Sequence, residues 1–210
     1  MYFFYTLMKN LLMVFAKSPI KGEVKTRLGN EIGFEKSHWV YPQLLKKTAE
    51  NISNNNQDIV VFHSKPNKKM ESIFDNAKNF LVQNGSDLGD KMQSAFQWAF
   101  NEKYKNVILI GTDLWNISES MVTRARNVLE NKDFVIGPTY DGGYYLIGMK
   151  KIKKKIFQNI PWSTNRVLEE TLKKIKNDSV YFLGIENDID DFIDLKDDLN
   201  LYKLYLEKFG

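Results

Sequence analysis

The sequence predicts a three-layer α/β fold with a doubly wound, mostly parallel sheet. Short apolar runs alternate along the whole chain with stretches in which apolar residues recur at helical spacing. The first run, Leu11 to Ala16, has six consecutive apolar residues, too few for a free-standing helix and typical of a strand buried on both faces. Polar and charged residues suited to chemistry follow the predicted strands rather than the helices.

In the first half of the chain, a basic loop follows this strand, and helical and strand patterns then alternate. Trp39, Val40, Leu44 and Ile52 show the helical spacing, and Asn54 to Asn56 predict the turn that ends that helix. The expected elements are a helix over 35–53, a strand over 59–62, a weak helix over 68–76, a strand over 80–83, a helix over 88–99 capped at Ser86 or Asp87, and a strand over 107–110.

The second half continues the alternation. Ser118 predicts a helix cap, and either Ser163 or Thr164 predicts another. The lysine run from 150 to 155 suggests a solvated helix start, with recruitment to anionic lipid as a second interpretation. The expected elements are a helix over 121–129, strands over 134–136 and 144–149, a helix over 167–175, a strand over 180–183 and a helical tail over 192–209.

Length and composition indicate one domain over residues 1–210, with residues 1–7 as an N-terminal extension and Met8 as an alternative start. The start of the chain lacks the basic residues of a signal peptide, and no stretch reaches the roughly 20 apolar residues of a membrane span. The absence of cysteine excludes disulfides and thiolate chemistry and fits a cytoplasmic protein. The sequence does not indicate an oligomeric state.

The net charge and the histidine content limit the classes of substrate and metal that the chain is expected to bind. A net charge of +4 suits an anionic substrate but is too small to indicate nucleic acid. With only His38 and His63, the sequence argues against a zinc centre built on histidine, and any metal is expected to be a hard cation held by carboxylates.

The basic loop after the first strand predicts a cradle for phosphate oxygens, with a solvated loop as the alternative. Lys17, Lys25 and Arg27 supply positive charge, Thr26 a hydroxyl and Gly22 a flexible turn. Because ligands of open α/β sheets bind beyond the carboxyl ends of the strands, we expect this loop to face the acidic residues that follow later strands.

Those acidic residues predict a metal site. Asp113 follows the strand over 107–110, and Asp190 comes shortly after the last strand, with Asp188 and Asp191 as its rivals. Asp113 and Asp190 are expected to hold one Mg²⁺ or Mn²⁺ from two sides, leaving positions for phosphate oxygens and water. A helix cap is the alternative role for Asp113, but Ser118 already fills it.

A further group of residues is expected to contact the substrate or acceptor. Each has a structural alternative: the acid and the glycines as a tight turn, the tyrosine as core, Trp162 as core and Ser163 as a helix cap. The group comprises Asp141, Gly142, Gly143, Tyr144, Trp162 and Ser163.

Several of these segments, taken in order, resemble one family. They are FAKSPIKGEVKTRL, SDLGDKMQSAF, VILIGTD, IGPTYDGGYYLIG, IPWSTNRVLEET and DIDDFIDL. The set resembles the rSAM/selenodomain-associated transferases, glycosyltransferase-like relatives of 2-phospholactate and molybdenum-cofactor guanylyltransferases. The resemblance implies a GT-A, or nucleotide-diphospho-sugar transferase, fold that binds a nucleotide and a divalent cation.

By position, the resemblance implies nucleotide contacts for Lys17, Lys25 and Arg27 and metal contacts for Asp113 and Asp190. The chain departs from the family pattern twice. Leu114 and Trp115 replace the usual Cys-Pro after Asp113, which alters the expected cleft wall. Asp191 replaces the threonine of the closing motif, which adds a negative charge beside the expected metal.

The residues and the resemblance together predict a metal-dependent transferase, with Asp113, Lys25 and Arg27 as its catalytic residues. Nucleotidylyl transfer from a nucleoside triphosphate to a small-molecule acceptor is favoured, because sugar transferases of this fold typically carry paired aspartates where this chain has Asp113 alone. A glycosyltransferase that uses a nucleotide-diphosphate sugar is the alternative. A noncatalytic nucleotide-sensing or partner-binding domain is the second alternative, and nucleic acid is not an expected partner.

Overall fold

A computed structural model describes residues 9–53 and 57–210. The predicted extension over residues 1–7, the alternative start at Met8 and the predicted turn at Asn54 to Asn56 lie outside the described residues.

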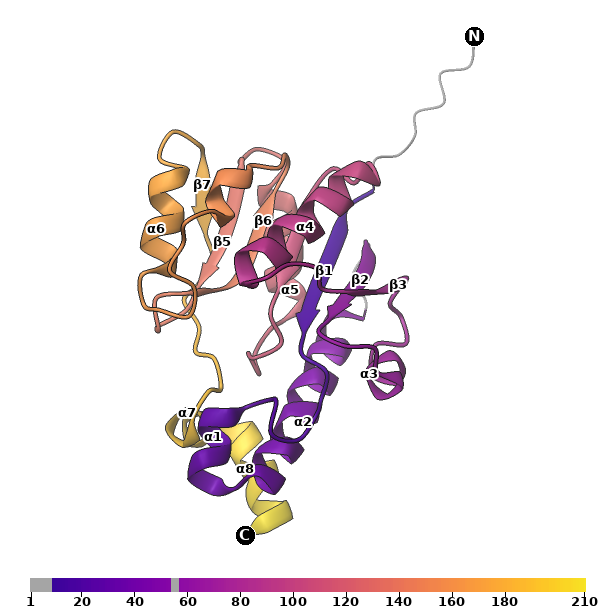
Figure 1. Ribbon diagram of the computed structural model, residues 1–210, viewed down its shortest axis with the longest axis vertical. Coiled ribbons are helices and arrows are strands. Elements are labelled where there is room, and N and C mark those ends of the chain that lie inside the picture. Colours follow the sequence, from indigo (N-terminus) through magenta and orange to yellow (C-terminus); the bar gives the residue numbers. More distant parts are fainter. Residues whose placement is uncertain (1–8, 54–56) are drawn as a thin grey trace.

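The described strands form one seven-stranded sheet in the order β3-β2-β1-β4-β6-β5-β7 (Figure 1). All pairs are parallel except those of β6, which runs antiparallel to both β4 and β5. The doubly wound, mostly parallel sheet predicted from the sequence is therefore confirmed. The strands are β1 Leu11–Ala16, β2 Asp58–His63, β3 Asn79–Val82, β4 Val107–Ile110, β5 Phe134–Pro138, β6 Tyr144–Met149 and β7 Val180–Phe182.

Helices cover both faces of the sheet. They are α1 Thr26–Ile32, α2 Phe34–Ile52, α3 Lys68–Ile73, α4 Leu88–Asn101, α5 Glu119–Val128, α6 Val167–Lys174, α7 Phe192–Asp197 and α8 Leu199–Phe209, with a 3₁₀ helix, η1, over Lys154–Phe157. Figure 1 shows α1, α7 and α8 together beyond the carboxyl end of β1. No helix within residues 9–53 and 57–210 has the length and apolar character needed to cross a membrane.

The alternation of side chains along β1 divides the core into two clusters. Leu12 and Val14 pack with side chains of α2 and α5, whereas Leu11 and Met13 pack with those of α4 and η1. Every residue of β1 is buried, as expected for a strand with helices on both sides.

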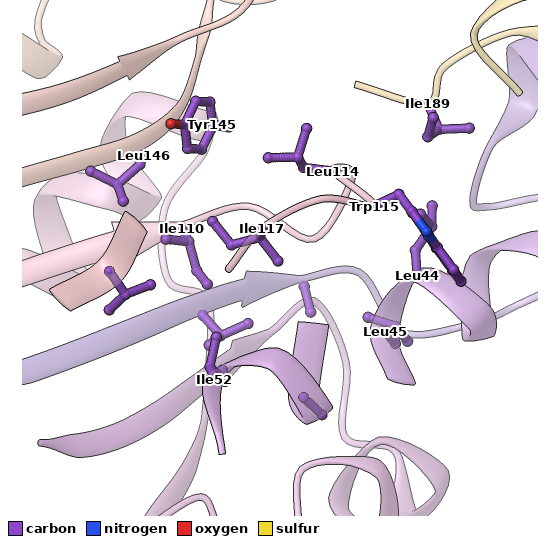
Figure 2. Close-up of a cluster of buried hydrophobic side chains, with 14 of the residues drawn as sticks. Leu44, Leu45, Ile52, Ile110, Leu114, Trp115, Ile117, Tyr145, Leu146 and Ile189 are labelled. Carbon is purple, nitrogen blue, oxygen red and sulfur yellow. The ribbon is translucent and has the colours of Figure 1, made fainter. Parts of the chain in front are cut away.

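The segment after β4 is part of the first cluster. Figure 2 shows Trp115 beside Leu44 of α2 and Ile117 beside Ile110 of β4, and Trp115 is only 7% exposed. The expectation that Trp115 forms a cleft wall is therefore wrong, because its ring is buried in the core. Leu114, in contrast, does reach a cavity.

Four local predictions differ from the structure. Thr26 and Arg27 begin α1 rather than lying in the basic loop, and the tail is two helices separated at Asp198. Neither Ser163 nor Thr164 caps α6, which begins after Arg166 without a side-chain cap. The lysine run does not start an α-helix: Lys154 and Lys155 lie in the short 3₁₀ helix η1.

Candidate functional site

The carboxyl ends of β1, β4, β5 and β7 meet at one edge of the sheet because these four strands run in the same direction. A cavity of about 450 Å³ lies there, which we call the charged cavity. It is lined by Lys17, Val24, Lys25, Thr26, Arg27, Tyr41, Leu88, Asp113, Asp141, Ser163, Thr164, Asn165 and Asp190. Residues predicted from five separate parts of the sequence therefore share one cavity.

Lys25 lies at the centre of the charged cavity. It is the residue before α1, its backbone is left-handed (φ 47°, ψ 47°), and its side chain is 3% exposed. The Nζ atom forms an ion pair with Oδ1 of Asp113 and lies 3.5 Å from Oδ1 of Asp190. Since the Asp113 and Asp190 side chains are 47% and 44% exposed, a buried cation supports two carboxylates that face the open cavity.

Arg27 adds a second cation near the same acidic group. One of its terminal nitrogens lies 3.5 Å from Oδ2 of Asp190, and its side chain is 73% exposed. The guanidinium is therefore available to an anion entering from solvent. Lys17, at the carboxyl end of β1, is also exposed and lines the cavity.

The ion pairs shift the pKa values of their members. Burial lowers the pKa of Lys25, but the negative charges of Asp113 and Asp190 outweigh burial and hold it above its ordinary value. Burial raises the pKa of Asp113, but the Lys25 ammonium outweighs it and keeps the pKa below the usual range. Lys25 and Asp113 are therefore both charged at neutral pH.

The acidic segment after β7 reaches the site through a backbone contact. The Ile189 N–H donates to the Asp113 carbonyl oxygen over 2.9 Å, which places Asp188 and Asp190 beside Asp113. Burial raises the pKa of Asp188 to about 7, and the nearby carboxylate of Asp113 adds to this rise.

Asp191 has a different role from the one that its charge suggested. Its carboxylate accepts the N–H groups of Ile193 and Asp194 over 2.8 and 3.0 Å and caps α7 in a capping box. A threonine can cap a helix in the same way, so the departure from the family motif replaces one cap with another. The expectation of an additional charge directed at a metal is not met.

A second cavity, of about 300 Å³, lies beside the charged one, and we call it the apolar cavity. The two cavities share Lys17, Tyr41, Leu88 and Asp113. The apolar cavity is lined by Phe15, Ala16, Lys17, Tyr41, Gln83, Leu88, Met92, Leu109, Gly111, Thr112, Asp113, Leu114, Tyr144, Tyr145 and Asp188. A ligand with a charged part and a flat, less polar part would fill both.

Two polar side chains that sequence reasoning missed organise this region. The Tyr41 hydroxyl accepts the Lys17 N–H over 2.9 Å and lies 3.1 Å from the Thr112 hydroxyl, joining the ends of β1 and β4. The Gln83 side-chain amide donates to the carbonyl oxygens of Ala16 and Phe62 over 3.3 and 3.0 Å. Both residues lie outside the segments that carry the resemblance, so only the fold indicates their roles.

Some predicted site residues lie outside the cavities. Gly142 (φ +87°) makes a turn, and a Cβ atom there would be 2.1 Å from the Asn165 carbonyl oxygen, so the chain itself occupies the space beside it. Trp162 packs on the second core cluster against Gly89. Gly22 (φ +81°) supplies a turn before Lys25.

The remaining predicted residues lie near the cavities in different ways. Asp141 and Ser163 line the charged cavity, and Tyr144 lines the apolar one. Gly143 donates its N–H to Oδ1 of Asp141 over 3.0 Å, and the Thr139 hydroxyl donates to the same oxygen over 2.6 Å. These bonds hold the Asp141 carboxylate at the mouth of the cavity.

The donor set suits a hard divalent cation. One carboxylate oxygen of Asp113 and one of Asp190 lie beside the same Lys25 ammonium. Mg²⁺ is commonly held by one or two carboxylates, with water and phosphate oxygens completing its coordination shell. Within residues 9–53 and 57–210, no three acidic or histidine side chains form a closed metal cage. The site therefore fits a cation shared with a phosphate ligand better than a permanently enclosed ion.

Comparisons with known proteins identify the fold. A family described as "Uncharacterized protein conserved in bacteria (DUF2064)" matches residues 47–164, a range that includes Asp113 but not Lys25 or Asp190. A comparison with functionally curated proteins finds no match. A solved Desulfovibrio desulfuricans protein, provisionally named a nucleotide-diphospho-sugar transferase, is 27% identical with a TM-score of 0.82, over 93% of this chain and 97% of that one.

Two more distant structures share the fold. A nucleotidyl transferase from Methanothermobacter is 13% identical with a TM-score of 0.62, over 95% of this chain and 99% of that one. The Mycobacterium tuberculosis protein Rv0371c, solved in complex with manganese, is 12% identical with a TM-score of 0.56, over 93% of this chain and 98% of that one. The chain thus has the fold of nucleotide-diphospho-sugar transferases, as its sequence predicts.

Proposed function

The chain belongs to the DUF2064 family, and on that premise we propose that it is a transferase acting on a nucleotide substrate with a divalent cation at its site. The reaction we favour is nucleotidylyl transfer from a nucleoside triphosphate to a small-molecule acceptor. The closer assignment to the rSAM/selenodomain-associated transferases, the single domain over residues 1–210 and the cytoplasmic location remain predictions from the sequence.

One observation carries the proposal: Lys25 and Arg27 meet Asp113 and Asp190 in a single cavity at the carboxyl edge of the sheet. Cations and hard carboxylate ligands within one cavity are the groups that a polyphosphate with its metal requires. The names of the solved structures that share the fold support the same class of substrate.

In the proposed reaction, an acceptor oxygen forms a bond to the α-phosphorus while the bond to the bridging oxygen breaks and pyrophosphate leaves. Lys25 and Arg27 bind phosphate oxygens and stabilise the negative charge that develops on the leaving group. Asp113 and Asp190 would hold Mg²⁺ or Mn²⁺, which supplies charge neutralisation at the phosphates when bound. The apolar cavity receives the less polar part of the nucleotide or acceptor.

A glycosyltransferase reaction with a nucleotide-diphosphate sugar is the alternative, favoured by the provisional name of the Desulfovibrio protein. The same cations would then stabilise a nucleoside diphosphate as leaving group. A noncatalytic nucleotide-sensing domain is the second alternative, and it would bind nucleotides without turnover.

The test compares leaving groups. The protein is incubated with Mg²⁺ and either nucleoside triphosphates or nucleotide sugars, with a low-molecular-weight filtrate of cell extract as acceptor source. We expect pyrophosphate release from a triphosphate, reduced about 100-fold or more by Asp113→Asn. The matched control is Asp197→Asn, which removes an exposed carboxylate in α7 and leaves the rate unchanged.

The other outcomes distinguish the alternatives. Release of nucleoside diphosphate from a nucleotide sugar, without pyrophosphate from any triphosphate, would establish the glycosyltransferase reaction instead. Nucleotide binding without any turnover would support the sensing domain. Equal rates for Asp113→Asn and Asp197→Asn would remove Asp113 from the reaction.

A further inference from the structure

On the basis of the nucleotide substrate proposed above, we propose that Gln83 selects nucleotides whose base carries an exocyclic amino group. The side-chain oxygen of Gln83 accepts a hydrogen bond from that amino group inside the apolar cavity. Gln83 is thus a specificity-determining residue, and cytosine, guanine and adenine are the class of base that it favours.

The two cavities set the direction in which a nucleotide lies. Lys25 and Arg27 line only the charged cavity, whereas Gln83 lines only the apolar one. Tyr41 and Leu88 line both, so the cavities adjoin. A nucleotide with its phosphates beside Lys25 therefore extends its base into the apolar cavity, toward Gln83.

The walls of the apolar cavity suit a flat ring. Leu88, the first residue of α4, is 44% exposed, so a ring that covers it removes apolar surface from water. A Cβ atom added at Gly111 would meet no atom within 4 Å, which shows open space at that wall. Apolar side chains from four different elements form much of the lining: Phe15, Leu88, Met92, Leu109 and Tyr145.

The side-chain amide of Gln83 has one possible orientation. Its nitrogen lies 3.3 Å from the Ala16 carbonyl oxygen and 3.0 Å from the Phe62 carbonyl oxygen. Because carbonyl oxygens only accept hydrogen bonds, the amide nitrogen rather than the amide oxygen has to face them. The Gln83 backbone is also fixed, since its N–H donates to the His63 carbonyl oxygen over 3.0 Å. The side chain therefore spans the ends of β1 and β2 with Oε1 directed away from both carbonyl groups.

The Oε1 atom of Gln83 remains able to accept a hydrogen bond. Within residues 9–53 and 57–210 it has no hydrogen-bond partner, and it is not among the buried polar atoms that lack one. Other polar groups of the apolar cavity differ: the Tyr41 and Thr112 hydroxyls share a hydrogen bond, and the Tyr144 hydroxyl oxygen is buried. Oε1 of Gln83 is therefore a neutral acceptor that a base entering the cavity meets.

An acceptor at this place discriminates between bases. An exocyclic amino group donates an N–H to it, whereas a carbonyl oxygen in the same position would face Oε1 with no proton between them. The Asp188 carboxylate also lines the apolar cavity, but the bond from the Ile189 N–H to the Asp113 carbonyl oxygen places it beside Asp113. Asp113 follows β4, on the other side of β1 from β2, so the carboxylates and the Gln83 amide occupy different ends of the cavity.

The test is titration calorimetry of the full chain with Mg²⁺ and three pairs of triphosphates, in each of which one member lacks the amino group of the other. The pairs are those of cytidine and uridine, guanosine and inosine, and adenosine and nebularine. We expect the tightest-binding triphosphate to carry the amino group and to bind at least about tenfold more tightly than its partner.

Gln83→Met keeps the length of the side chain and removes the acceptor, so the preference within that pair should fall below about twofold. The Ala16 carbonyl oxygen also accepts the Ser64 N–H over 3.1 Å, so it keeps a partner in this variant. The matched control is Gln158→Met, at an exposed position that lines neither cavity, and it should keep the preference. Thermal unfolding checks that each variant is folded.

A second variant tests the place of the ring. Gly111→Leu puts a side chain into the open space of the apolar cavity, so it should weaken the binding of every nucleoside triphosphate about tenfold or more. Inorganic tripolyphosphate has no ring and should bind this variant as tightly as it binds the unchanged protein.

The outcomes separate this assignment from the proposed function. Equal binding of the tightest triphosphate and its partner, or a preference that persists in Gln83→Met, would overturn the role of Gln83 and leave the nucleotide substrate in place. Unchanged nucleotide binding by Gly111→Leu would place the base outside the apolar cavity and would overturn it as well. Binding of none of the six nucleotides would overturn the proposed function together with this assignment.

Discussion

Lys25 combines two features that conflict in most residues. Its left-handed backbone favours glycine, whereas its buried ammonium needs the nearby carboxylates. A lysine in this conformation is retained only where the surrounding structure compensates for it, and here two carboxylates do so.

Replacing Lys25 by alanine or glycine separates these features. Both variants lose the cation, so both should lose about 100-fold or more in kcat/KM. Glycine adopts the left-handed conformation without a Cβ penalty, so Lys25→Gly should be more stable than Lys25→Ala by about 1 kcal/mol. Thermal unfolding should show a Tm about 2–4 °C higher for the glycine variant.

Lys25→Arg is the control, because it keeps a charge in the cavity and should retain more activity than either. Equal stability of the alanine and glycine variants would mean that the left-handed conformation is not maintained. In that case the position of the Lys25 side chain beside Asp113 would also need revision.

Elements contribute to the site through their ends. The cap of α7 is an example: Asp194 accepts the N–H groups of Asp190 and Asp191 over 2.9 and 3.1 Å, while Asp191 caps the helix in return. The backbone of Asp190 is thus fixed by the first turn of the helix that follows it.

Removing this cap should lower the stability of the protein and loosen the backbone of Asp190 at the site. Asp191→Ala should lower the free energy of unfolding by about 1 kcal/mol, whereas Asp191→Thr should cost less because threonine also caps. Urea unfolding measures the effect. Asp197→Ala is the control at the other end of α7, where an acid is unfavourable, and it should not destabilise.

A pH-dependent contact joins Asp58 of β2 to a residue just before β3 and to a residue just after α4. The Asp58 carboxylate accepts hydrogen bonds from Lys78 over 2.6 Å and from the Tyr104 hydroxyl over 2.8 Å. Burial raises the pKa of Asp58, but these bonds outweigh burial and lower it. A lowered folded-state pKa stabilises the protein above the unfolded value of about 4, and the contribution is lost as pH falls through the folded value.

Asp58→Asn should therefore destabilise the protein at pH 7 by about 1 kcal/mol, and the effect should become smaller as the pH falls below about 4. Urea unfolding at pH 7 and at a pH below about 4 tests this. Asp75→Asn, at an exposed position, should show no such difference. A constant effect of Asp58→Asn across pH would indicate that packing rather than charge is responsible.

The elements also show what a sequence can and cannot predict. The limits of β1 and β4 agree with the prediction because uninterrupted apolar runs of four to six residues are too short for a helix and typical of buried strands. Asp87 and Ser118 cap their helices as expected, each accepting an N–H three residues later. α1 was missed because its seven residues contain few apolar positions, so no periodic pattern marks it.

At the scale of the whole molecule, strand direction made the site predictable. Lys25, Asp113 and Asp190 were placed together because parallel strands end at one edge, and the charged cavity contains all three. Tyr41 and Gln83 could not be predicted, since their roles depend on which neighbours the fold brings to their side chains. The role of Asp191 was predicted wrongly because the sequence does not distinguish a carboxylate that faces a ligand from one that caps a helix.

Ligand binding by the whole molecule should depend on the cation. A nucleoside triphosphate present at about 100 times its Kd adds about 2.7 kcal/mol to the free energy of unfolding, which raises Tm by several degrees. We expect this rise with Mg²⁺ and a smaller one with EDTA. Asp113→Asn should remove the difference between the two conditions. A rise that EDTA does not change would argue against a metal-bridged nucleotide.

The charged cavity and the apolar cavity share Lys17, Tyr41, Leu88 and Asp113. One molecule that spans both cavities is bound at two places at once, so it is held more tightly than either of its parts alone. A free phosphate or a free base should therefore compete poorly with an intact nucleotide. Inhibitor screening should begin with compounds that join an anionic group to a less polar ring.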